Sequence, residues 1–285
     1  MLKTDSNNRL ARFPSWLSQR VRFEKGVEEV KEKIASLRIN TVCQSARCPN
    51  IYDCFSRYRC TFLILGKYCT RSCRFCAIET RKELSCPDKN ELLSIREAVR
   101  ELKLQHVVIT SVTRDDLIDG GAGHFADCIK VLRDEGAHLD IEVLVPDFQG
   151  NKQSIKEVVS AKPDILAHNV ETVPRLYRNV RPEALYKRSL EVLRFAKDLD
   201  PSLVTKSGMM LGLGETRKEI YSAMKDLRAI GCDIITIGQY LKGDMGCLDV
   251  EEFLAPEEFD KMSVFAKEIG FKESFCGPFI RSSYK

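Results

Sequence analysis

The sequence lacks several features that would place it in a special class of protein. No apolar run is long enough to span a membrane, and residues 1–12 are polar and mixed in charge rather than an apolar export signal. Near-identical repeats and low-complexity tracts are absent, which argues against a repeat array. The formal net charge of +4 over 285 residues permits an acidic protein partner but does not call for nucleic acid. We therefore expect a cytoplasmic monomer that binds neither membrane nor nucleic acid.

Histidine is scarce, whereas cysteine is abundant. The chain has four histidines, of which His106, His124 and His138 show no metal-ligand spacing. Twelve cysteines in a chain without an export signal indicate metal binding in a reducing compartment rather than a disulfide scaffold.

The densest group of cysteines runs from Cys69 to Cys76, a C-x3-C-x2-C pattern that follows the apolar segment Thr61–Gly66. Three thiolates this close in sequence can converge on one soft metal centre. A [4Fe–4S] cluster held by three cysteines keeps one iron open for a non-protein ligand. Structural zinc sites usually pair two C-x2-C knuckles, and only Cys73 and Cys76 form one here. The run therefore predicts a three-cysteine iron–sulfur cluster.

A second group of cysteines precedes the first. Cys43, Cys48 and Cys54 form a C-x4-C-x5-C pattern with a turn-favouring Pro-Asn pair inside it. The group suggests a second cluster, although three cysteines and a remote ligand could also hold zinc. Cys60 competes for a ligand position, but it stands at the start of a predicted strand, and we interpret it as a bystander.

Along most of the chain, short apolar stretches alternate with amphipathic ones. This alternation predicts an α/β fold with a parallel sheet, and six strand–helix units predict a partial (β/α)6 TIM-like barrel rather than a complete eight-unit barrel. We divide the chain into an N-terminal extension of residues 1–60, a barrel of residues 61–270 and a C-terminal tail of residues 271–285. The predicted strands are Thr61–Gly66, His106–Ser111, Asp140–Val145, Asp164–His168, Val204–Met210 and Asp233–Gly238. The predicted helices are Gly26–Leu37, Glu91–Lys103, Ala122–Glu135, Lys152–Ala161, Leu185–Leu199, Arg217–Ile230 and Pro256–Ile269.

Polar clusters follow several of the predicted strands, at the edge where barrel enzymes carry their chemistry. The cluster Asp115–Gly121 fits a helix cap and turn, or a contact to a charged ligand. Gly208–Glu215 fits a glycine-rich strand exit, or a loop whose backbone approaches a ligand closely. His168 and Asn169 fit a satisfied pair of side chains at the barrel mouth, or ligand contacts.

The run Cys69–Cys76, with the aromatic Phe75 before its last cysteine, resembles the signature of the radical S-adenosylmethionine (SAM) superfamily. In that superfamily the open iron binds the amino and carboxylate groups of SAM, and the aromatic residue lies near its adenine. Gly208–Glu215 also matches the superfamily pattern G-x-I-x-G-x-x-E, with Met210 in place of isoleucine. The cofactor contacts that this resemblance implies are Phe75, Asp119, Asn169, Glu171, Gly212, Glu215 and Gln239.

Seven segments together resemble the lipoyl synthase family, over nearly the whole chain. Within the superfamily, the C-x4-C-x5-C group combined with Arg281–Tyr284 (RSSY) is specific to that family. The segments are Val42–Cys54, Thr61–Cys76, Val108–Phe125, His168–Pro182, Thr205–Thr216, Thr236–Leu241 and Gly277–Tyr284.

The resemblance implies two [4Fe–4S] clusters. The first, on Cys69, Cys73 and Cys76, would cleave SAM to a 5′-deoxyadenosyl radical. The second is an auxiliary cluster, carried by the terminal extensions and consumed as the sulfur donor. Its fourth ligand in the family is a serine oxygen, which we place at Ser283 with Ser282 as the alternative. An alkoxide matches iron less well than a thiolate, which suits an iron that must later be released. Its cysteine ligands would be Cys43, Cys48 and Cys54.

The implied activity is the insertion of two sulfur atoms, at C6 and C8 of an octanoyl chain on a lysine of a carrier domain, to give a lipoyl group. The carrier would be an acyltransferase domain of a 2-oxoacid dehydrogenase or the glycine-cleavage H protein. An electron donor such as ferredoxin or flavodoxin and an iron–sulfur carrier for cluster repair would complete the partners. We expect a docking face for the acidic carrier, built from the arginines of residues 9–22 and from Arg175, Arg178, Arg181 and Arg188.

The chain departs from the family pattern at three positions near the predicted site. Gly243 and Cys247 stand where a proline and a histidine are common, and Ala167 stands where an asparagine is common. None of the three is a predicted cluster ligand, so the departures bear on carrier choice or efficiency. Two alternatives stay open: another sulfur-inserting radical SAM enzyme, biotin synthase-like or a methylthiotransferase, and a metal-stabilised binding module without activity.

Overall fold

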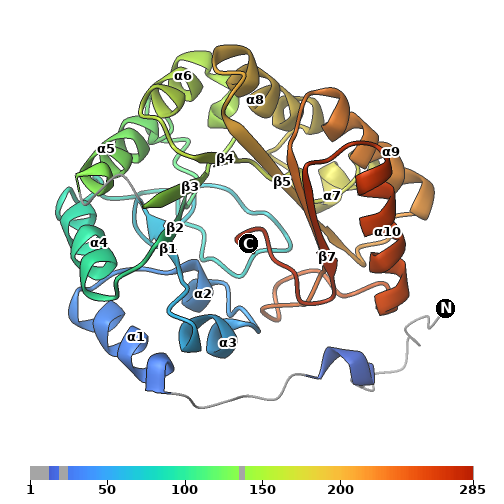
Figure 1. The fold of residues 1–285 in the computed structure, drawn as a ribbon, viewed down its shortest axis with the longest axis horizontal. Coiled ribbons are helices and arrows are strands. Elements are labelled where there is room, and N and C mark those ends of the chain that lie inside the picture. Colours follow the sequence, from blue (N-terminus) through green and yellow to red (C-terminus); the bar gives the residue numbers. More distant parts are fainter. Residues whose placement is uncertain (1–12, 19–24, 135–138, 285) are drawn as a thin grey trace.

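The computed structural model describes residues 13–18, 25–134 and 139–284, and its centre is one sheet of seven strands. All neighbouring strands are parallel and follow the sequence order, so β1 and β7 form the two edges. Figure 1 shows the strands curving into an open barrel with the helices around its outside. The strands are β1 Thr61–Ile64, β2 His106–Ser111, β3 Asp140–Leu144, β4 Ile165–Ala167, β5 Val204–Leu211, β6 Ile234–Gln239 and β7 Glu273–Gly277.

A helix connects each strand to the next, because parallel neighbours require a crossover. These helices bury an apolar stripe against the sheet and expose charged side chains. Helix α9, for example, begins at a capping box in which Thr216 and Glu219 exchange hydrogen bonds. The crossover helices are α4 Asn90–Glu101, α5 Ala122–Arg133, α6 Lys152–Ser160, α8 Tyr186–Leu199, α9 Arg217–Ala229 and α10 Pro256–Glu268. Shorter helices within the connections are η2 Phe148–Gly150, η3 Pro174–Leu176 and α7 Tyr177–Val180.

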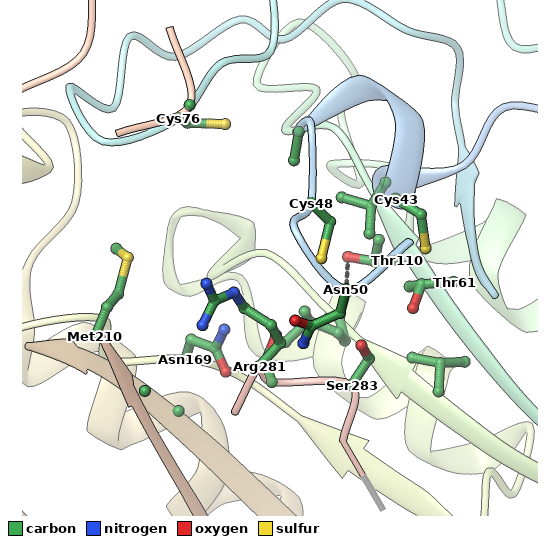
Figure 2. Close-up of a pocket in the computed structure, with 18 of the residues that line it drawn as sticks. Cys43, Cys48, Asn50, Thr61, Cys76, Thr110, Asn169, Met210, Arg281 and Ser283 are labelled. Carbon is green, nitrogen blue, oxygen red and sulfur yellow. Dashed lines mark hydrogen bonds between the residues drawn. The ribbon is translucent and has the colours of Figure 1, made fainter. Parts of the chain in front are cut away.

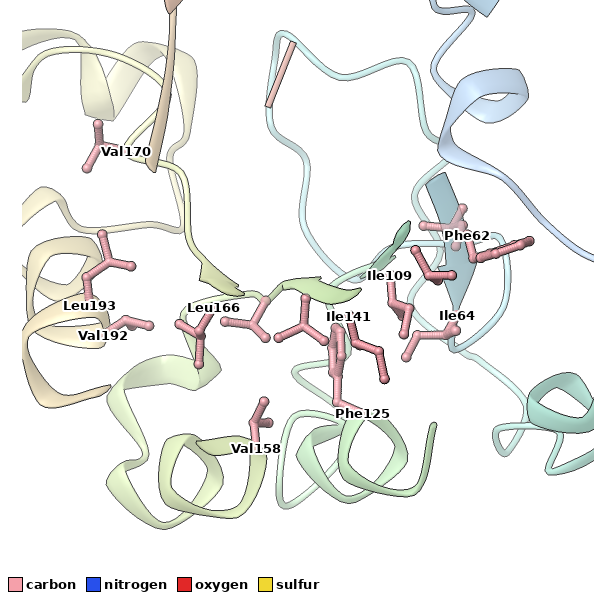
Figure 3. Close-up of a cluster of buried hydrophobic side chains, with 14 of the residues drawn as sticks. Phe62, Ile64, Ile109, Phe125, Ile141, Val158, Leu166, Val170, Val192 and Leu193 are labelled. Atoms are coloured by element: carbon pink, nitrogen blue, oxygen red, sulfur yellow. The ribbon is translucent and has the colours of Figure 1, made fainter. Parts of the chain in front are cut away.

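The main core lies between the sheet and the surrounding helices (Figure 3). Ile109, Ile141 and Leu166 extend from the strands, and Phe125 and Val158 meet them from α5 and α6; all five side chains are fully buried. Because side chains alternate along a strand, the residues between the outward ones face the inside of the barrel. That inner face is partly polar and includes Thr110, Glu142, Lys206 and Thr236.

The predicted fold class is confirmed, but the predicted number of strands was wrong. All six predicted strands and the predicted helices are present, with ends within two residues of the predicted ones; residue 135 lies outside the described residues. The seventh strand, β7, pairs with β6 along five residues that we placed in the C-terminal tail. Its sequence, Glu-Ser-Phe-Cys-Gly, has no β-branched run and lies half-exposed at the sheet edge, so local periodicity does not reveal it.

The residues before the sheet cover its first edge. Helix α1, Lys25–Ser36, packs on α3, Ile51–Ser56, while α2, Val42–Ser45, packs on β1. The predicted N-terminal arm of residues 9–22 lies mostly outside the described residues, and the part that is described contains η1, Ser15–Leu17. Among the described helices, none combines the length and the apolar character needed to cross a membrane.

Candidate functional site

A cavity of about 1380 Å³ lies inside the open barrel. It is lined by both cysteine groups, by the inner faces of several strands and by Arg281–Tyr284 from the C-terminal tail (Figure 2). The fold thus brings all the predicted cluster ligands to one space. They are Cys43, Cys48, Cys54, Cys69, Cys73, Cys76 and Ser283, with the alternative Ser282 beside them.

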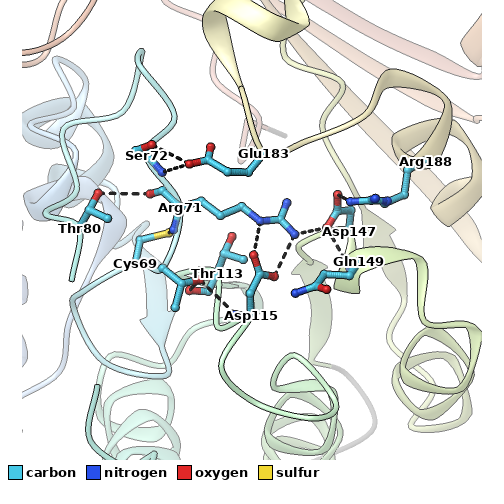
Figure 4. A network of polar contacts seen from close by, with 11 residues as sticks. Cys69, Arg71, Ser72, Thr80, Thr113, Asp115, Asp147, Gln149, Glu183 and Arg188 are labelled. Carbon is cyan, nitrogen blue, oxygen red and sulfur yellow. Dashed lines mark hydrogen bonds and ion pairs between the residues drawn. The ribbon is translucent and has the colours of Figure 1, made fainter. Parts of the chain in front are cut away.

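A buried arginine holds the loop that carries Cys69–Cys76 (Figure 4). Arg71 donates from Nε to Asp115 at 2.6 Å and from Nη2 to Asp147 at 2.7 Å. Asp147 also accepts from Arg188 at 3.2 Å. Burial by itself raises the pKa of Asp147, but the hydrogen bonds and the charge of Arg71 outweigh it and bring that pKa to about 2. Because the two carboxylates follow β2 and β3, this network fastens the loop to the ends of two strands.

The thiols of this loop are chemically suited to a cationic partner. Burial raises the pKa of Cys73 to about 11, against the opposing charge of Arg181, and raises the pKa of Cys76 to about 12. All twelve cysteines are free thiols. A buried thiol stays protonated unless a cation replaces its proton, so this donor set fits an iron–sulfur cluster that brings positive charge.

The second cysteine group lies on two short helices and the turn between them. Burial raises the pKa of Cys43 on α2 to about 11 and that of Cys54 on α3 to about 12, and neighbouring thiols, including Cys48, add to both shifts. Cys60 is buried beside Cys43 and Cys54, which raise its pKa further, so it remains a competitor for a ligand position. In the part of the chain that the structure describes, no three His, Cys, Asp or Glu side chains are grouped as ligands of a single metal ion.

The C-terminal tail passes close to the second cysteine group. Asn50, which lies inside that group, donates from Nδ2 to the carbonyl oxygen of Phe279 at 2.6 Å. Gly238 on β6 gives the tail room, because a Cβ atom there would lie 2.0 Å from the carbonyl oxygen of Ile280. The tail is therefore packed backbone against backbone on the inner face of the sheet.

Two side chains of the tail face the cavity beside the second cysteine group. Figure 2 shows Arg281 and Ser283 in the same space as Cys48, with Cys76 at its far side. Burial lowers the pKa of Arg281, and a hydrogen bond with the Cys48 thiol opposes that shift. The proposed serine ligand and the second cysteine group are thus brought together from opposite ends of the chain.

Four of the seven predicted cofactor contacts line the cavity. Asn169 donates from Nδ2 to Glu171 at 3.0 Å, while Oδ1 of Asn169 and Nε of Arg181 are buried without a hydrogen-bond partner in the described part of the chain. Burying such groups is costly unless a ligand completes their hydrogen bonds. The four contacts that line the cavity are Phe75, Asn169, Glu171 and Gln239.

Asp119 does not line the cavity, and the structure gives it the role of a helix cap. Its carboxylate accepts from the backbone amides of Gly121 at 2.9 Å and Gly123 at 2.8 Å, at the start of α5. Of the two roles that the sequence allows for Asp115–Gly121, the cap is therefore the one that Asp119 takes.

Gly212 and Glu215 also stay outside the cavity lining and shape the turn between β5 and α9. Glu215 accepts from the amides of Gly212 at 3.0 Å and Leu213 at 2.9 Å, and from the Thr172 hydroxyl at 2.7 Å. Gly212 has a φ of 107°, where a side chain would be strained. The amide of Gln239, although at the cavity, is likewise engaged by backbone groups, so it positions the loop after β6.

Three of the four barrel arginines predicted for carrier docking are buried or already paired, while Arg178 is exposed and the arginines of residues 9–22 lie outside the described residues. Arg181 is buried, with 9% of its surface exposed. Arg188 pairs with Asp147, and Arg175 forms a bidentate pair with Glu219. An arginine already paired with a carboxylate offers little positive potential to an acidic partner, so these three residues add little to a docking face, which stays a prediction.

Two of the three departures from the family pattern lie at the cavity. A Cβ atom on Gly243 would meet the side chain of Ala77 at 3.3 Å and the carbonyl oxygen of Ala46 at 3.4 Å, which places this residue between the two cysteine groups. Cys247 is buried and lines the cavity, whereas Ala167 is buried on β4.

Sequence reasoning misses the residues that hold the site in place. Arg71 and Asn50 read as polar spacers between cysteines, yet they anchor the cysteine loops to distant segments. The only sequence signal is charge complementarity, since Arg71 finds its carboxylates in polar clusters that follow strands. Arg181 gives no signal of burial, because its neighbours come together only in the fold.

Comparisons with known proteins find relatives over nearly the whole chain. Residues 63–227 match the model of the Radical SAM superfamily. The lipoyl synthase of Caldicellulosiruptor saccharolyticus is 50% identical over 271 residues, covering 95% of this chain and 95% of the relative. The lipoyl synthase of Chlorobaculum parvum is 46% identical, with 95% and 92% covered. The solved structure of methylornithine synthase superposes with a TM-score of 0.57 at 14% identity, covering 89% of this chain and 82% of that one, which shows the fold alone.

Proposed function

The chain belongs to the lipoyl synthase family of the radical SAM superfamily, and on that premise we propose which of its residues carry the chemistry. It inserts two sulfur atoms, at C6 and C8 of an octanoyl group on a protein lysine, and so forms a lipoyl group. Bound SAM and two [4Fe–4S] clusters supply the radical that removes hydrogen and the sulfur that replaces it. The relatives favour this activity over that of a biotin synthase-like enzyme, a methylthiotransferase or an inactive binding module.

We propose that Cys69, Cys73 and Cys76 hold the cluster that binds SAM. The support is a set of three thiols at the cavity, two of them strongly raised in pKa by burial, on a loop that Arg71 fastens to two strand ends. A loop anchored in this way keeps its ligands in place while SAM enters and leaves.

We assign Cys43, Cys48 and Cys54 to the auxiliary cluster, with Ser283 as the fourth ligand and Ser282 as the alternative. The observation that carries the proposal is that both cysteine groups and the serine tail line one cavity. An octanoyl chain in that cavity would lie between the residues that hold SAM and those that hold the sulfur donor.

The polar group formed by Asn169, Glu171 and Arg181 is suited to SAM. The free Oδ1 of Asn169 can accept a hydrogen bond from a hydroxyl or ammonium group, and Nε of Arg181 can donate one to a carboxylate. Burial raises the pKa of Glu171, although the charge of Arg181 opposes the shift. Phe75 offers an aromatic ring for the adenine.

The activity of the family determines the general kind of partner that the enzyme needs. The enzyme acts on a lipoyl carrier and needs a reductant. More narrowly, we propose that the carrier is an acyltransferase domain of a 2-oxoacid dehydrogenase or the glycine-cleavage H protein. Ferredoxin or flavodoxin would supply electrons, an iron–sulfur carrier would rebuild the auxiliary cluster, and the enzyme would work as a cytoplasmic monomer.

Anaerobic reconstitution tests both the activity and the ligand assignment. With SAM, a reductant and an octanoyl-lysyl peptide, the protein should form lipoyl-lysine, read by mass spectrometry, and carry about eight irons per chain. The triple variant C69A/C73A/C76A should carry about four irons and form no 5′-deoxyadenosine. Cys86→Ala, an exposed cysteine outside the cavity lining, is the control and should behave as the unmodified chain. Formation of 5′-deoxyadenosine by the triple variant would show that the assignment is wrong.

A further inference from the structure

A buried lysine–glutamate pair lies on the inner face of the sheet, and the proposed chemistry does not use it. Lys206 on β5 and Glu142 on β3 are 2% and 1% exposed. Nζ of Lys206 donates to the two carboxylate oxygens of Glu142 at 2.8 Å and 3.1 Å. Removing two charges from water is costly and offsets most of their mutual attraction, so a buried ion pair is a weak source of stability. Stability alone therefore does not account for a buried ion pair in this position.

The same ammonium group holds the C-terminal tail. Nζ of Lys206 donates to the backbone carbonyl oxygen of Tyr284 at 3.0 Å. An ammonium group has three N–H donors, so the two oxygens of Glu142 and the carbonyl of Tyr284 account for all three. Tyr284 directly follows Ser283, which means that Lys206 fixes the backbone one residue away from the proposed iron ligand.

The ring of Tyr284 also packs on that of Phe275, with the ring centroids 5.7 Å apart, whereas the other backbone contacts of the tail lie on the opposite side of Ser283. Asn50 binds the carbonyl of Phe279, and Gly238 accommodates the carbonyl of Ile280. Without Lys206, the end of the tail would lose the hydrogen bond of Tyr284 to the sheet and would be left with the ring contact between Tyr284 and Phe275 on β7. Ordering a free backbone costs conformational entropy, so a loose tail would present the serine oxygen less effectively.

We propose that Lys206 and Glu142 are positioning residues for Ser283, which hold the end of the tail against the sheet and so present the serine oxygen to the auxiliary cluster. Glu142 directs the lysine, because its two carboxylate oxygens take two of the three donors of Nζ and leave the third for the carbonyl of Tyr284. This inference rests on the proposed assignment of Ser283 as the fourth ligand.

The test uses the full chain, reconstituted anaerobically, with the double variant K206M/E142L. The two changes remove both charges together and leave apolar side chains of similar size, which avoids an unpaired buried charge. Hydrogen–deuterium exchange should become faster at the backbone amides of residues 279–284 and stay unchanged at those of β2. SAM cleavage should stay at the level of the unmodified chain.

The state of the auxiliary cluster is measured by the rate at which a chelator removes its iron, in the C69A/C73A/C76A background that keeps this cluster alone. K206M/E142L should speed iron release about tenfold, as expected for the loss of one hydrogen bond from a charged donor. Ser283→Ala should speed it at least as much. Adding K206M/E142L to Ser283→Ala should then change the rate by less than about twofold, because both act through one ligand.

Two further variants keep the test decisive if the double variant folds poorly. Gly238→Ala displaces the tail at Ile280 without any change of charge and should also speed exchange and iron release. Lys197→Met removes a lysine that pairs with Asp233 at 2.6 Å, away from the tail, and should leave both readouts unchanged.

The possible outcomes separate this inference from the ligand assignment. If Ser283→Ala speeds iron release while K206M/E142L leaves release and tail exchange unchanged, the positioning role is refuted and Ser283 stands as ligand. If Ser283→Ala leaves the release rate unchanged, the ligand assignment itself fails.

Discussion

At the scale of single residues, burial leaves the thiols of the site in need of a cation, whereas the charge of the buried Arg71 is already balanced by carboxylates of the protein. It raises the pKa of Cys73 and Cys76, so these groups need a cation to become thiolates. Arg71 is also buried, but two carboxylates compensate its charge. The cysteines are therefore arranged to receive a cofactor, whereas the arginine is already satisfied by the protein.

Substitution of Ser283 should separate cluster retention from sulfur transfer. Ser283→Cys should keep the auxiliary cluster but slow sulfur insertion, because a thiolate holds iron more firmly than an alkoxide. Hydrogen removal from C6 should survive better than completion of the lipoyl group, as judged by mass spectrometry of the one-sulfur and two-sulfur products. Cys60→Ala is the matched change at the competing residue and should retain the cluster. Full activity of Ser283→Cys together with cluster loss in Cys60→Ala would identify Cys60 as the ligand.

Loss of Arg71 should weaken the first cluster without removing any of its ligands. Arg71→Met leaves Arg188 as the one arginine that pairs with the buried Asp147 among the described residues, at a cost of about 3 kcal/mol in unfolding free energy. Thermal unfolding, iron content and SAM cleavage should all decrease. Arg57→Met removes an exposed pair with Asp53 and should cost less than about 1 kcal/mol. Equal effects of the two substitutions would contradict the anchoring role of Arg71.

At the scale of secondary-structure elements, the segments that follow the strands divide into two kinds. The segment after β4 brings Asn169 and Glu171 to the cavity, where Oδ1 of Asn169 has no hydrogen-bond partner in the described part of the chain. The turn after β5 uses the carboxylate of Glu215 to bind its own backbone amides. Both segments are rich in residue types that bind ligands in other proteins. Only their contacts in the fold show which segment is free to bind a ligand and which one shapes its own turn.

Substitutions in these two segments should therefore have opposite profiles. Asn169→Ala should weaken SAM binding about tenfold with little effect on stability, since it removes a hydrogen bond that only the ligand completes. Glu215→Ala should lower the unfolding free energy by about 2–3 kcal/mol, because buried donors of Gly212, Leu213 and Thr172 lose their acceptor. SAM titration and thermal unfolding measure the two effects. Unchanged SAM affinity in Asn169→Ala would limit that residue to a structural role.

At the scale of the whole molecule, the open barrel is completed by segments from both ends of the chain. The N-terminal extension supplies one cysteine group and covers β1, while the tail after β7 enters the barrel interior (Figure 1). The loop of Cys69–Cys76, which we propose holds the first cluster, is fastened to the barrel by Arg71 through Asp115 and Asp147, and neither carboxylate belongs to the tail.

Removal of the tail should therefore separate the two clusters. A chain ending at Pro278 keeps all seven strands and the backbone hydrogen bond from Gln239 to Pro278. We expect about four irons per chain, continued SAM cleavage and no lipoyl product, measured by iron analysis and mass spectrometry. Retention of eight irons would show that Arg281–Tyr284 contributes no ligand.

Much of the fold could be predicted because it depends on local spacing. Strand–helix alternation located six strands, whereas β7 escaped prediction because its five residues become a strand only by pairing with β6. The cysteine groups were recognisable from spacing alone. The roles of Asp119 and Glu215 could not be read from the sequence, because an acidic residue after a strand can equally cap a helix or bind a ligand, and the structure shows both carboxylates bound to backbone amides.

The sequence by itself determined the family, the two cysteine groups and the alternation that builds the barrel, since each depends on neighbours along the chain. Only the tertiary structure decided how these parts meet. Asn50 reaches Phe279 across 229 positions, Lys206 reaches Glu142 across 64, and Lys206 reaches Tyr284 across 78. Contacts of this kind leave no local pattern in the sequence, because the partners become neighbours only when the sheet curves and the tail enters the barrel.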